Sequence, residues 1–386
     1  MFDLTLSLLV GCMVASTPTP QLPLKVVPMA TLPVDLAEDQ QIWQKTGSLK
    51  GDYQALLKAI DHSLQYLDTD KAEHDYQAYG MPGITRSRVI RSLRRFRQLV
   101  VGAKSAQALE TAVKREFQFY QSVGNDQRGK VDFTGYYEAT YTASRRPTAV
   151  YRYPLYRTPA DFQQWPKPHP ARSQLEGNDG LQGSQGRLKG LELVWLRDRL
   201  QAFLVQVQGS ARLQITDGTE MTVGFAGKTD RSYTSLGKSL VKDGKFTLKE
   251  LSLPLVMDYF QKNPQDLDHY IPLNQSFVFF RETFGAPPTG SLGVPVTGER
   301  SIATDKSIMP PGALALIHTQ LPYYNNTQQL EFREVSRFVL DQDTGSAIKG
   351  PGRVDIFMGT GSKAKARAGV MTQSGQLYYL LLKNAP

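Results

Sequence analysis

The stretch from residue 338 to 361, FVLDQDTGSAIKGPGRVDIFMGTG, constrains the fold of this chain more than any other. Apolar residues at 338–340 and 354–357 predict two strands, and the glycine-rich residues 345–352 predict the connection between them. If the two apolar neighbours of Asp355 face the core, the alternation of side chains along a strand turns Asp355 to the opposite face. A carboxyl group that is partly removed from water there has a raised pKa, as a general acid requires.

These aspartates also have simpler interpretations. Asp343 could accept hydrogen bonds from the backbone of a turn, and Asp355 could be the outward residue of an edge strand. The sequence DTGSA, which begins at Asp343, also has the D-T-G-[SA] pattern of aspartic proteases, in which two such aspartates share one proton. Only one copy is present, so a protease would have to be a homodimer. The polar Gln342 also precedes it, where aspartic proteases have apolar residues.

Residues 36–123 have a helical pattern. Apolar residues recur at spacings of three and four in two segments, and a third helix is expected at 108–120. The two apolar sets are Tyr53, Leu56, Leu57, Ile60, Leu64 and Leu67, then Val89, Leu93, Phe96, Leu99 and Val100. Arginines cluster on the second segment and are expected to form a solvated face. We assign this region a scaffolding role.

Strands are expected from Val131 onward. FTGYYEATYTAS alternates aromatic and small residues, and the prolines of YRYPLYRTP confine that run to an edge or an extended segment. Residues 161–190, rich in proline and glycine, predict a long irregular loop. We expect a hairpin within 203–223 around an Asp217-Gly218 turn, a helix at 240–261 and a strand at 276–281.

The predicted hairpin places three amides, those of Gln206, Gln208 and Gln214, on one face of a strand. Gly209 would leave the backbone open to a close neighbour there. Such a row of amides suits hydrogen bonding to a polar ligand, but it is equally typical of a solvated sheet face.

Length and charge narrow the possible functions. A chain of 386 residues exceeds what one core usually serves, so two domains are expected. The net charge of +9 favours an anionic partner, but no nucleic-acid-binding motif accompanies it, so we expect no nucleic acid partner. The five histidines are scattered and none pairs at ligand spacing, so neither a metal nor another cofactor is expected.

Residues 1–22 are expected to be a targeting leader. The apolar run from residue 4 to 14 is too short to span a bilayer, and the chain's only cysteine, Cys12, follows Leu9-Val10-Gly11. That match to a lipoprotein cleavage box would make Cys12 the lipidated first residue. The alternative is that Cys12 is an ordinary small residue of the leader.

Six separate motifs in order resemble those of the membrane-bound lytic murein transglycosylase A family. The stretch GERSIATDKSIMPPGALAL, which begins at Gly298, together with the aspartate-rich stretch, is similar to the domain named for its three aspartates, here Asp305, Asp343 and Asp355. The other motifs are FTGYY from Phe133, YPLYRTP from Tyr153, FLVQVQGSARL from Phe203, YTSLGK from Tyr233 and NQSFVFFRE from Asn274. The resemblance covers roughly residues 130–385.

The resemblance implies a mainly β (α+β) fold. It implies a double-psi β-barrel with N-terminal helices and a smaller inserted β-domain, and a glycan groove between the two. The expected ranges are 1–22 for the leader, 30–139 for the helical part with the first barrel segment, 140–286 for the insert and 287–386 for the three-aspartate domain.

The resemblance also implies a reaction: non-hydrolytic cleavage of the MurNAc-GlcNAc bond of peptidoglycan, giving 1,6-anhydroMurNAc ends. By match to the family motif, Asp355 is the acid and base, and Asp343 and Asp305 shape its surroundings. The candidates for glycan contact are Tyr136, Tyr137, Gln206, Gln208, Gly209, Tyr233 and Lys238. The tyrosines could equally face the core, since aromatic residues serve both roles.

Partners and location follow from the same resemblance. We expect a monomer that is exported to the periplasm or carried as an outer-membrane lipoprotein of a Gram-negative-type bacterium, with peptidoglycan strands as its partner and a lipid as its anchor. A second functional class stays open: a wall-binding module with an expansin-like barrel would keep the aromatic and amide surface and would lack the acid. The presence of all three aspartates favours the enzyme.

Overall fold

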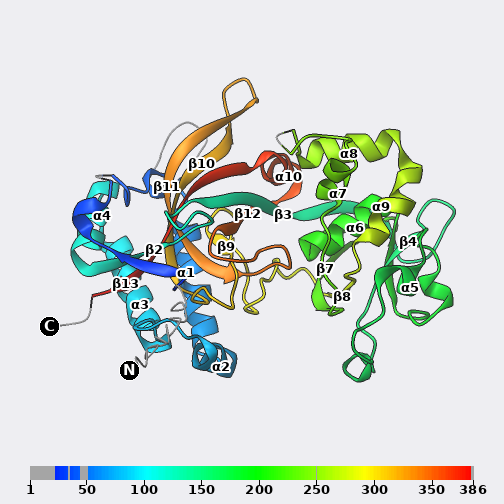
Figure 1. Cartoon of the computed structure of the whole chain (residues 1–386), viewed down its shortest axis with the longest axis horizontal. Coiled ribbons are helices and arrows are strands. Elements are labelled where there is room, and N and C mark those ends of the chain that lie inside the picture. Colours follow the sequence, from blue (N-terminus) through cyan, green and yellow to red (C-terminus); the bar gives the residue numbers. More distant parts are fainter. Residues whose placement is uncertain (1–21, 34, 44–50, 249, 384–386) are drawn as a thin grey trace, which may run out of the picture.

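The computed structural model describes residues 22–33, 35–43, 51–248 and 250–383, which form a mixed α/β structure around a 13-stranded sheet (Figure 1). The strands are β1 (Leu24–Val27), β2 (Phe117–Ser122), β3 (Val131–Ser144), β4 (Tyr153–Tyr156), β5 (Glu192–Leu196), β6 (Ser210–Ile215), β7 (Glu220–Lys228), β8 (Val278–Glu282), β9 (Ser301–Ala303), β10 (Leu314–Tyr324), β11 (Leu330–Asp343), β12 (Arg353–Thr360) and β13 (Thr372–Leu382). The helices are α1 (Tyr53–Leu67), α2 (Asp70–Ala78), α3 (Arg86–Gly102), α4 (Ala106–Glu116), α5 (Arg172–Glu176), α6 (Arg199–Gln208), α7 (Leu236–Lys242), α8 (Leu253–Lys262), α9 (Leu267–Leu273) and α10 (Gly361–Val370).

Strand β3 joins two parts of the sheet. Along the main path the order is β1-β2-β13-β10-β11-β9-β12-β3-β6-β7-β8, and β3 pairs with β13 as well, so the strands from β13 to β3 return on themselves. The first half of β3 pairs with β12 and β13, whereas its second half pairs with β5 and β6. Figure 1 shows β3 passing from the lobe with α1–α4 to the lobe with α6–α9.

The N-terminal helices cover the first lobe, as their periodicity predicts. α1 and α3 bury Leu56, Ile60, Val89, Leu93 and Phe96 in the same core as the sheet. The expectation of a fully solvated arginine face on α3 is wrong for one residue, Arg88, which is 5% exposed. Its guanidinium donates to the carbonyl of Leu382 and to the hydroxyl of Tyr120, and so ties α3 to the two strands beneath it.

The expected strand at 203–208 is wrong. These residues lie in α6, which begins after Asp198, whose carboxylate accepts a hydrogen bond from the Gln201 amide. The helix ends at Gly209, whose φ of +79° is the left-handed conformation typical of a glycine that ends a helix. The hairpin itself is confirmed, but it comprises β6 and β7 around the Asp217-Gly218 turn.

Two expected helices have other bounds. Helix α4 ends at Glu116, because Phe117 and Phe119 bury alternate side chains in β2, which pairs with β13. The helix expected at 240–261 is in fact two, α7 and α8. The chain turns at Gly244, whose φ is +70°, and Pro254 lies in the first turn of α8, where a missing amide hydrogen costs nothing. The loop at 161–190 is largely irregular and includes the short α5.

The aspartate-rich stretch forms the two predicted strands, β11 and β12. They are not direct neighbours, because the short strand β9 lies between them, parallel to β11 and antiparallel to β12. Val354 and Ile356 are fully buried, whereas Asp355 is turned to the other face, as the alternation predicts. The ends of β9, β11 and β12 therefore place three different aspartates at one edge of the sheet.

Cys12 and all of the predicted leader except its last residue, Leu22, lie outside the described residues. Within the described ranges, none of the helices has the length and apolar character needed to cross a membrane.

Candidate active site

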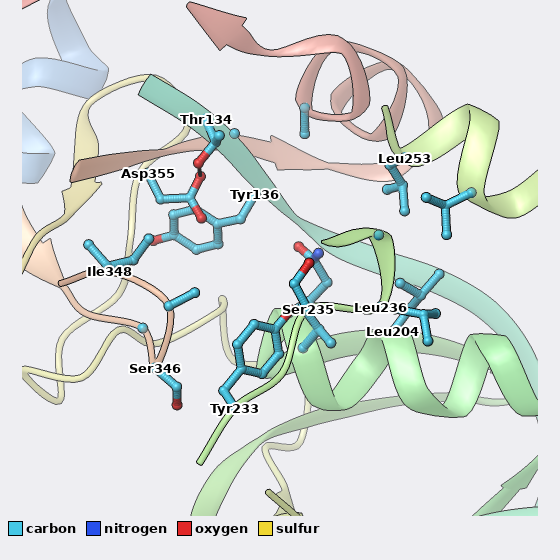
Figure 2. Close-up of a pocket in the computed structure, with 18 of the residues that line it drawn as sticks. Thr134, Tyr136, Leu204, Tyr233, Ser235, Leu236, Leu253, Ser346, Ile348 and Asp355 are labelled. Atoms are coloured by element: carbon cyan, nitrogen blue, oxygen red, sulfur yellow. Dashed lines mark hydrogen bonds between the residues drawn. The ribbon is translucent and has the colours of Figure 1, made fainter. Parts of the chain in front are cut away.

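A cavity of about 360 Å³ lies between the two lobes and contains Asp355. One side is formed by β3, β12 and the loop at 345–348, and the other by α6, α7, α8 and the segment that carries Tyr233. Figure 2 shows Asp355 beside Thr134 and above the ring of Tyr136, with Ile348 on one side and Tyr233 and Ser235 on the other. Both lobes therefore contribute to the surroundings of the carboxyl group.

Thr134 holds one oxygen of the Asp355 carboxyl group. Thr134 Oγ1 lies 2.9 Å from Asp355 Oδ1 and 3.0 Å from Nη2 of Arg353. A guanidinium can only donate, so the threonine hydroxyl accepts from Arg353 and gives its single hydrogen to Asp355. Oδ1 is thus an acceptor, which leaves Oδ2 as the oxygen that carries the proton when the group is neutral.

The pKa of Asp355 is raised to about 6. Burial is the main cause because it disfavours the charged form, and the nearby negative charge of Asp343 acts in the same direction. The hydrogen bond from Thr134 and the charge of Arg353 act in the opposite direction. Near neutral pH the carboxyl group therefore exchanges a proton readily, as a group that acts both as acid and as base requires.

Asp343 lies at the end of β11, and its carboxylate is held from three sides. Tyr136 donates its hydroxyl to Oδ2 at 2.8 Å, and the amides of Ser291 and Thr344 each donate to Oδ1 at 2.8 Å. Burial raises the pKa of Asp343, and these hydrogen bonds oppose that rise. Tyr136 packs against Phe357 with ring centroids 5.1 Å apart, so its ring lines the cavity while its hydroxyl fixes Asp343.

Asp305 supports the loop that borders the cavity. Its carboxylate accepts from the amide of Gly350 at 2.9 Å and from the hydroxyl of Ser307 at 2.7 Å. Burial alone would raise the pKa of Asp305, but these hydrogen bonds outweigh burial and lower it. The third aspartate thus stays charged and anchors the loop at 345–350.

Asp341 is a fully buried aspartate for which the sequence predicted no role. It pairs with Lys306 and accepts hydrogen bonds from Thr304 at 2.8 Å and from Tyr379 at 2.6 Å. Lys306 also donates to the carbonyl of Asp343. The pair of Lys306 and Asp341 thus holds the backbone at Asp343, the residue whose carboxylate lies near Asp355.

The predicted glycan-contact residues are only partly brought together. Tyr136, Tyr233, Gln206 and Gln208 line the cavity. Tyr137 does not, since it is 2% exposed and packs in the core, because its side chain points to the opposite face of β3 from Tyr136. Gly209 ends α6 outside the cavity lining, and Lys238 is exposed on α7 away from it.

The two glutamines act differently from the expected row of amides. Because they lie on a helix, Gln206 and Gln208 do not share one strand face. The carbonyl oxygen of Gln206 accepts from the buried Arg172 at 2.7 Å, and that of Gln208 accepts from the Tyr137 amide at 3.0 Å. Gln214 lies on the exposed side of β6, where it donates to Glu220. Gln206 and Gln208 thus connect α6 to Arg172 of α5 and to β3.

Sequence reasoning missed Thr134, Arg353 and the apolar residues of α6–α8 that line the cavity. Thr134 lies beside Asp355 because β3 and β12 pair in parallel, and that register is not visible in a single sequence. The helical spacing of Leu200, Phe203 and Leu204 was the available signal for the apolar side.

Chemically, the arrangement offers one proton-exchanging carboxyl group in a cavity between the two lobes. Asp355 is the one carboxylate among the described residues that line the cavity. The described part of the chain also contains no group of three His, Cys, Asp or Glu side chains placed to hold a metal ion. Acid and base catalysis by a single group is therefore what this site supports.

Two family models match separate parts of the chain. Residues 132–281 match the MltA specific insert domain, and residues 300–381 match the 3D domain. The first range contains Thr134, Tyr136 and Tyr233, and the second contains all three aspartates of the sequence motif.

Several known proteins are similar over most of the chain. The membrane-bound lytic murein transglycosylase A of Vibrio cholerae is 31% identical over 267 residues, which is 68% of each chain, and that of Escherichia coli K12 is 30% identical over 269 residues, 69% of each. The crystal structure of membrane-bound lytic murein transglycosylase from Agrobacterium tumefaciens superposes with a TM-score of 0.72 at 25% identity, covering 94% of this chain and 98% of that one. The fold of E. coli MltA with bound chitohexaose matches with a TM-score of 0.68 at 24% identity, covering 95% of this chain and 96% of that one.

Proposed function

This chain belongs to the membrane-bound lytic murein transglycosylase A family, and from that premise we propose that it cleaves the MurNAc-GlcNAc β-1,4 bond of peptidoglycan without water. The product ends in 1,6-anhydroMurNAc. The relatives at 30% and 31% identity are lytic murein transglycosylases by name, and the related E. coli structure holds chitohexaose, a glycan chain. Peptidoglycan glycan strands are therefore the substrate.

The observation that carries this function is the lone acid in the cavity. Hydrolytic glycosidases use two carboxylates that flank the bond. Here Asp355 alone, among the described residues, brings a carboxylate to the cavity lining, while the nearby Asp343 is occupied by three hydrogen-bond donors. A reaction that needs one carboxyl group fits this site better than one that needs two.

In the first step, Asp355 donates the proton on Oδ2 to the glycosidic oxygen as the bond from that oxygen to C1 of MurNAc breaks. In the second, the C6 hydroxyl of the same MurNAc attacks C1, and its proton passes to the Asp355 carboxylate. Each atom is accounted for without water, and Asp355 regains its proton. The attacking hydroxyl belongs to the substrate, so it is present at a high effective concentration.

The other aspartates act through Asp355 and its loop. Asp343 raises the pKa of Asp355 and holds Tyr136, and Asp305 anchors the loop at 345–350. We also propose that the ring of strands from β13 to β3 is the double-psi barrel of the family. In this proposal residues 30–139 and 287–386 build that barrel with its helices, and residues 140–286 form the insert.

We propose that the protein is exported and acts in the periplasm or at the outer membrane, since its relatives are membrane-bound by name. Residues 1–22 would form the leader, and Cys12 would be the residue that carries the lipid. The chain would act as a monomer, because both walls of the cavity come from one chain.

Mass spectrometry of the muropeptides released from purified peptidoglycan tests this function. Products with anhydro ends support it. Products that carry the additional mass of water would instead indicate a hydrolase and a second carboxylate. Binding to the wall without any release would indicate the expansin-like binding module.

The pH dependence of the rate is a first prediction. Because Asp355 must begin protonated, kcat/KM is expected to fall as the pH rises through about 6, the pKa of the free enzyme. The Asp343→Asn variant removes a negative charge that raises the pKa of Asp355, so the same decline should occur at lower pH. Initial rates of anhydro-muropeptide release across pH 4 to 8 measure both. A variant whose decline moves to higher pH would contradict the assigned role of Asp343.

Thr134 gives a second prediction. Thr134→Val keeps the shape of the side chain but removes the hydrogen bond that orients Asp355 and lowers its pKa. We expect kcat to fall about tenfold, the effect of losing one hydrogen bond to a charged group, and the decline of the rate to move to higher pH. Thr134→Ser keeps the hydroxyl and should stay near the parent in both respects. A loss in Thr134→Ser with little change in Thr134→Val would mean that the methyl group, not the hydrogen bond, matters.

A further inference from the structure

The cavity has a second, apolar end that the cleavage mechanism does not use. We call it the aliphatic end and define it by Leu204, Leu236, Leu251, Leu253 and Val256. Figure 2 shows Leu204, Leu236 and Leu253 on the side of the cavity away from Ile348 and Asp355, with Ser235 between the acid and Leu236. A ligand whose reacting bond lies at Asp355 would therefore extend a neighbouring group toward the leucines.

The aliphatic end is built from several helices packed closely. Gly237 in α7 packs closely against Leu251, since a Cβ there would lie 2.8 Å from a methyl group of that side chain. Gly369 in α10 similarly approaches Pro254 and Leu253 at the start of α8. Leu251 and Leu253 are only partly buried, so their free surface faces the cavity. The leucines thus form a closely packed wall with apolar surface left uncovered.

Sugar rings are usually covered by flat aromatic side chains, and here Tyr136 and Tyr233 lie near the acid. A third aromatic residue of the lining, Phe203, packs among the leucines and is 3% exposed, so its ring offers little surface to a ligand. The wall beyond them is aliphatic, which suits a small branched apolar group and not the hydroxyl-covered edge of a sugar ring. In a strand of alternating GlcNAc and MurNAc, only MurNAc has such a branch, the methyl-bearing lactyl group on O3. GlcNAc has a free hydroxyl at that position.

We propose that the aliphatic end binds the lactyl group of the MurNAc residue, and that it selects MurNAc over GlcNAc beside the bond that is broken. The proposal rests on the function proposed above. Burial of the lactyl methyl group against Leu251 and Leu253 stabilises the muramic ligand, whereas a hydroxyl would lose water there without gaining a partner. The wall would therefore also fix the direction in which the strand lies relative to Asp355.

The test compares two hexasaccharides that differ in the lactyl group. One is the peptide-free GlcNAc-MurNAc hexasaccharide and the other is chitohexaose. Calorimetry measures the Kd of each, in the Asp355→Asn background so that neither is cleaved, and at elevated salt so that the lactyl carboxylate contributes little. Leu253→Ala enlarges the aliphatic end. The control is Leu248→Ala, because Leu248 is 67% exposed and outside the cavity lining.

Leu253→Ala is expected to weaken the muramic hexasaccharide about tenfold and chitohexaose less than about twofold, as for loss of methyl-sized contacts in a pocket. Should Leu253→Ala fail to fold, Val207→Trp provides the same test. Val207 is 39% exposed, lines the cavity and follows Leu204 by three positions on α6, so tryptophan there fills the aliphatic end from its open side.

Equal weakening of both hexasaccharides would overturn the proposal, since the aliphatic end would then bind the acetamido group that both sugars carry. No weakening of either would overturn it as well. The function itself is judged separately, from the anhydro ends that the parent protein releases. If the parent protein releases anhydro ends but Leu253→Ala weakens both hexasaccharides equally, the proposed function stands and the proposed lactyl site is wrong.

Discussion

Asp355→Asn is expected to abolish the release of anhydro-muropeptides. Asparagine keeps the size of the side chain and can still accept from Thr134, but it can neither donate a proton to the glycosidic oxygen nor take one from the C6 hydroxyl. General acid catalysis is worth about 10²- to 10⁴-fold, and this variant loses the base as well. The rate should therefore fall by at least about 10⁴-fold, or more than 5 kcal/mol of barrier. Mass spectrometry of the products measures it.

Asp132→Asn is the matched control for this variant. Asp132 is also an aspartate on a strand of the same lobe, two residues before Thr134, but it hydrogen-bonds Asn125 and Ser374 outside the cavity lining. The Asp132→Asn protein should release anhydro-muropeptides at a rate within about threefold of the parent, because these two hydrogen bonds are exposed and contribute little. An Asp355→Asn protein that is folded and keeps more than a few per cent of the parent rate would mean that another group supplies the proton.

The sequence predicted the strands that carry the acid, because their signals are local. Two apolar neighbours around Asp355 were enough to predict which way it faces. The strand expected at 203–208 was wrong because alternating glutamine and valine resemble a strand, whereas the structure follows the Asp198 cap, the Gly209 end and the helical spacing of Phe203 and Leu204. Local alternation was outweighed by packing against α7, α8 and α9.

The candidate site could be predicted only where one residue carries the chemistry. Asp355 and Asp343 stand out by their type and setting, but the partner of each depends on strand order. Thr134 meets Asp355 because β3 lies beside β12, although 221 positions separate them. Tyr136 and Tyr137 are neighbours whose side chains must point to opposite faces of β3, and only the packing of the folded chain decides that the first lines the cavity and the second fills the core.

The same sheet depends on a buried charge network at its other edge. Arg300, with no exposed surface, precedes β9, the strand between the two that carry Asp343 and Asp355. Its guanidinium lies 2.5 Å from Asp39 and 2.7 Å from Asp52, and it donates to the carbonyl of Phe338 at 2.7 Å. The network thus fixes the N-terminal segment and β11 around the start of β9.

Arg300→Met is expected to lower the free energy of unfolding by about 3–5 kcal/mol, because it leaves the carboxylate of Asp39, 1% exposed, buried without its counter-charge. Urea denaturation measures the change. The control is Arg97→Met, since Arg97 and Asp61 form an ion pair that is largely exposed and should contribute at most about 1 kcal/mol.

A double variant decides whether the loss comes from the unpaired charge or from lost packing. If the unpaired carboxylate is the cause, Asp39→Asn added to Arg300→Met should recover part of the stability, because a buried amide costs less than a buried charge. The amide can still accept from the backbone of Phe338, as Asp39 does at 3.0 Å. If the second substitution instead adds its own loss, the arginine stabilises β9 through its contact with the Phe338 carbonyl and not through charge.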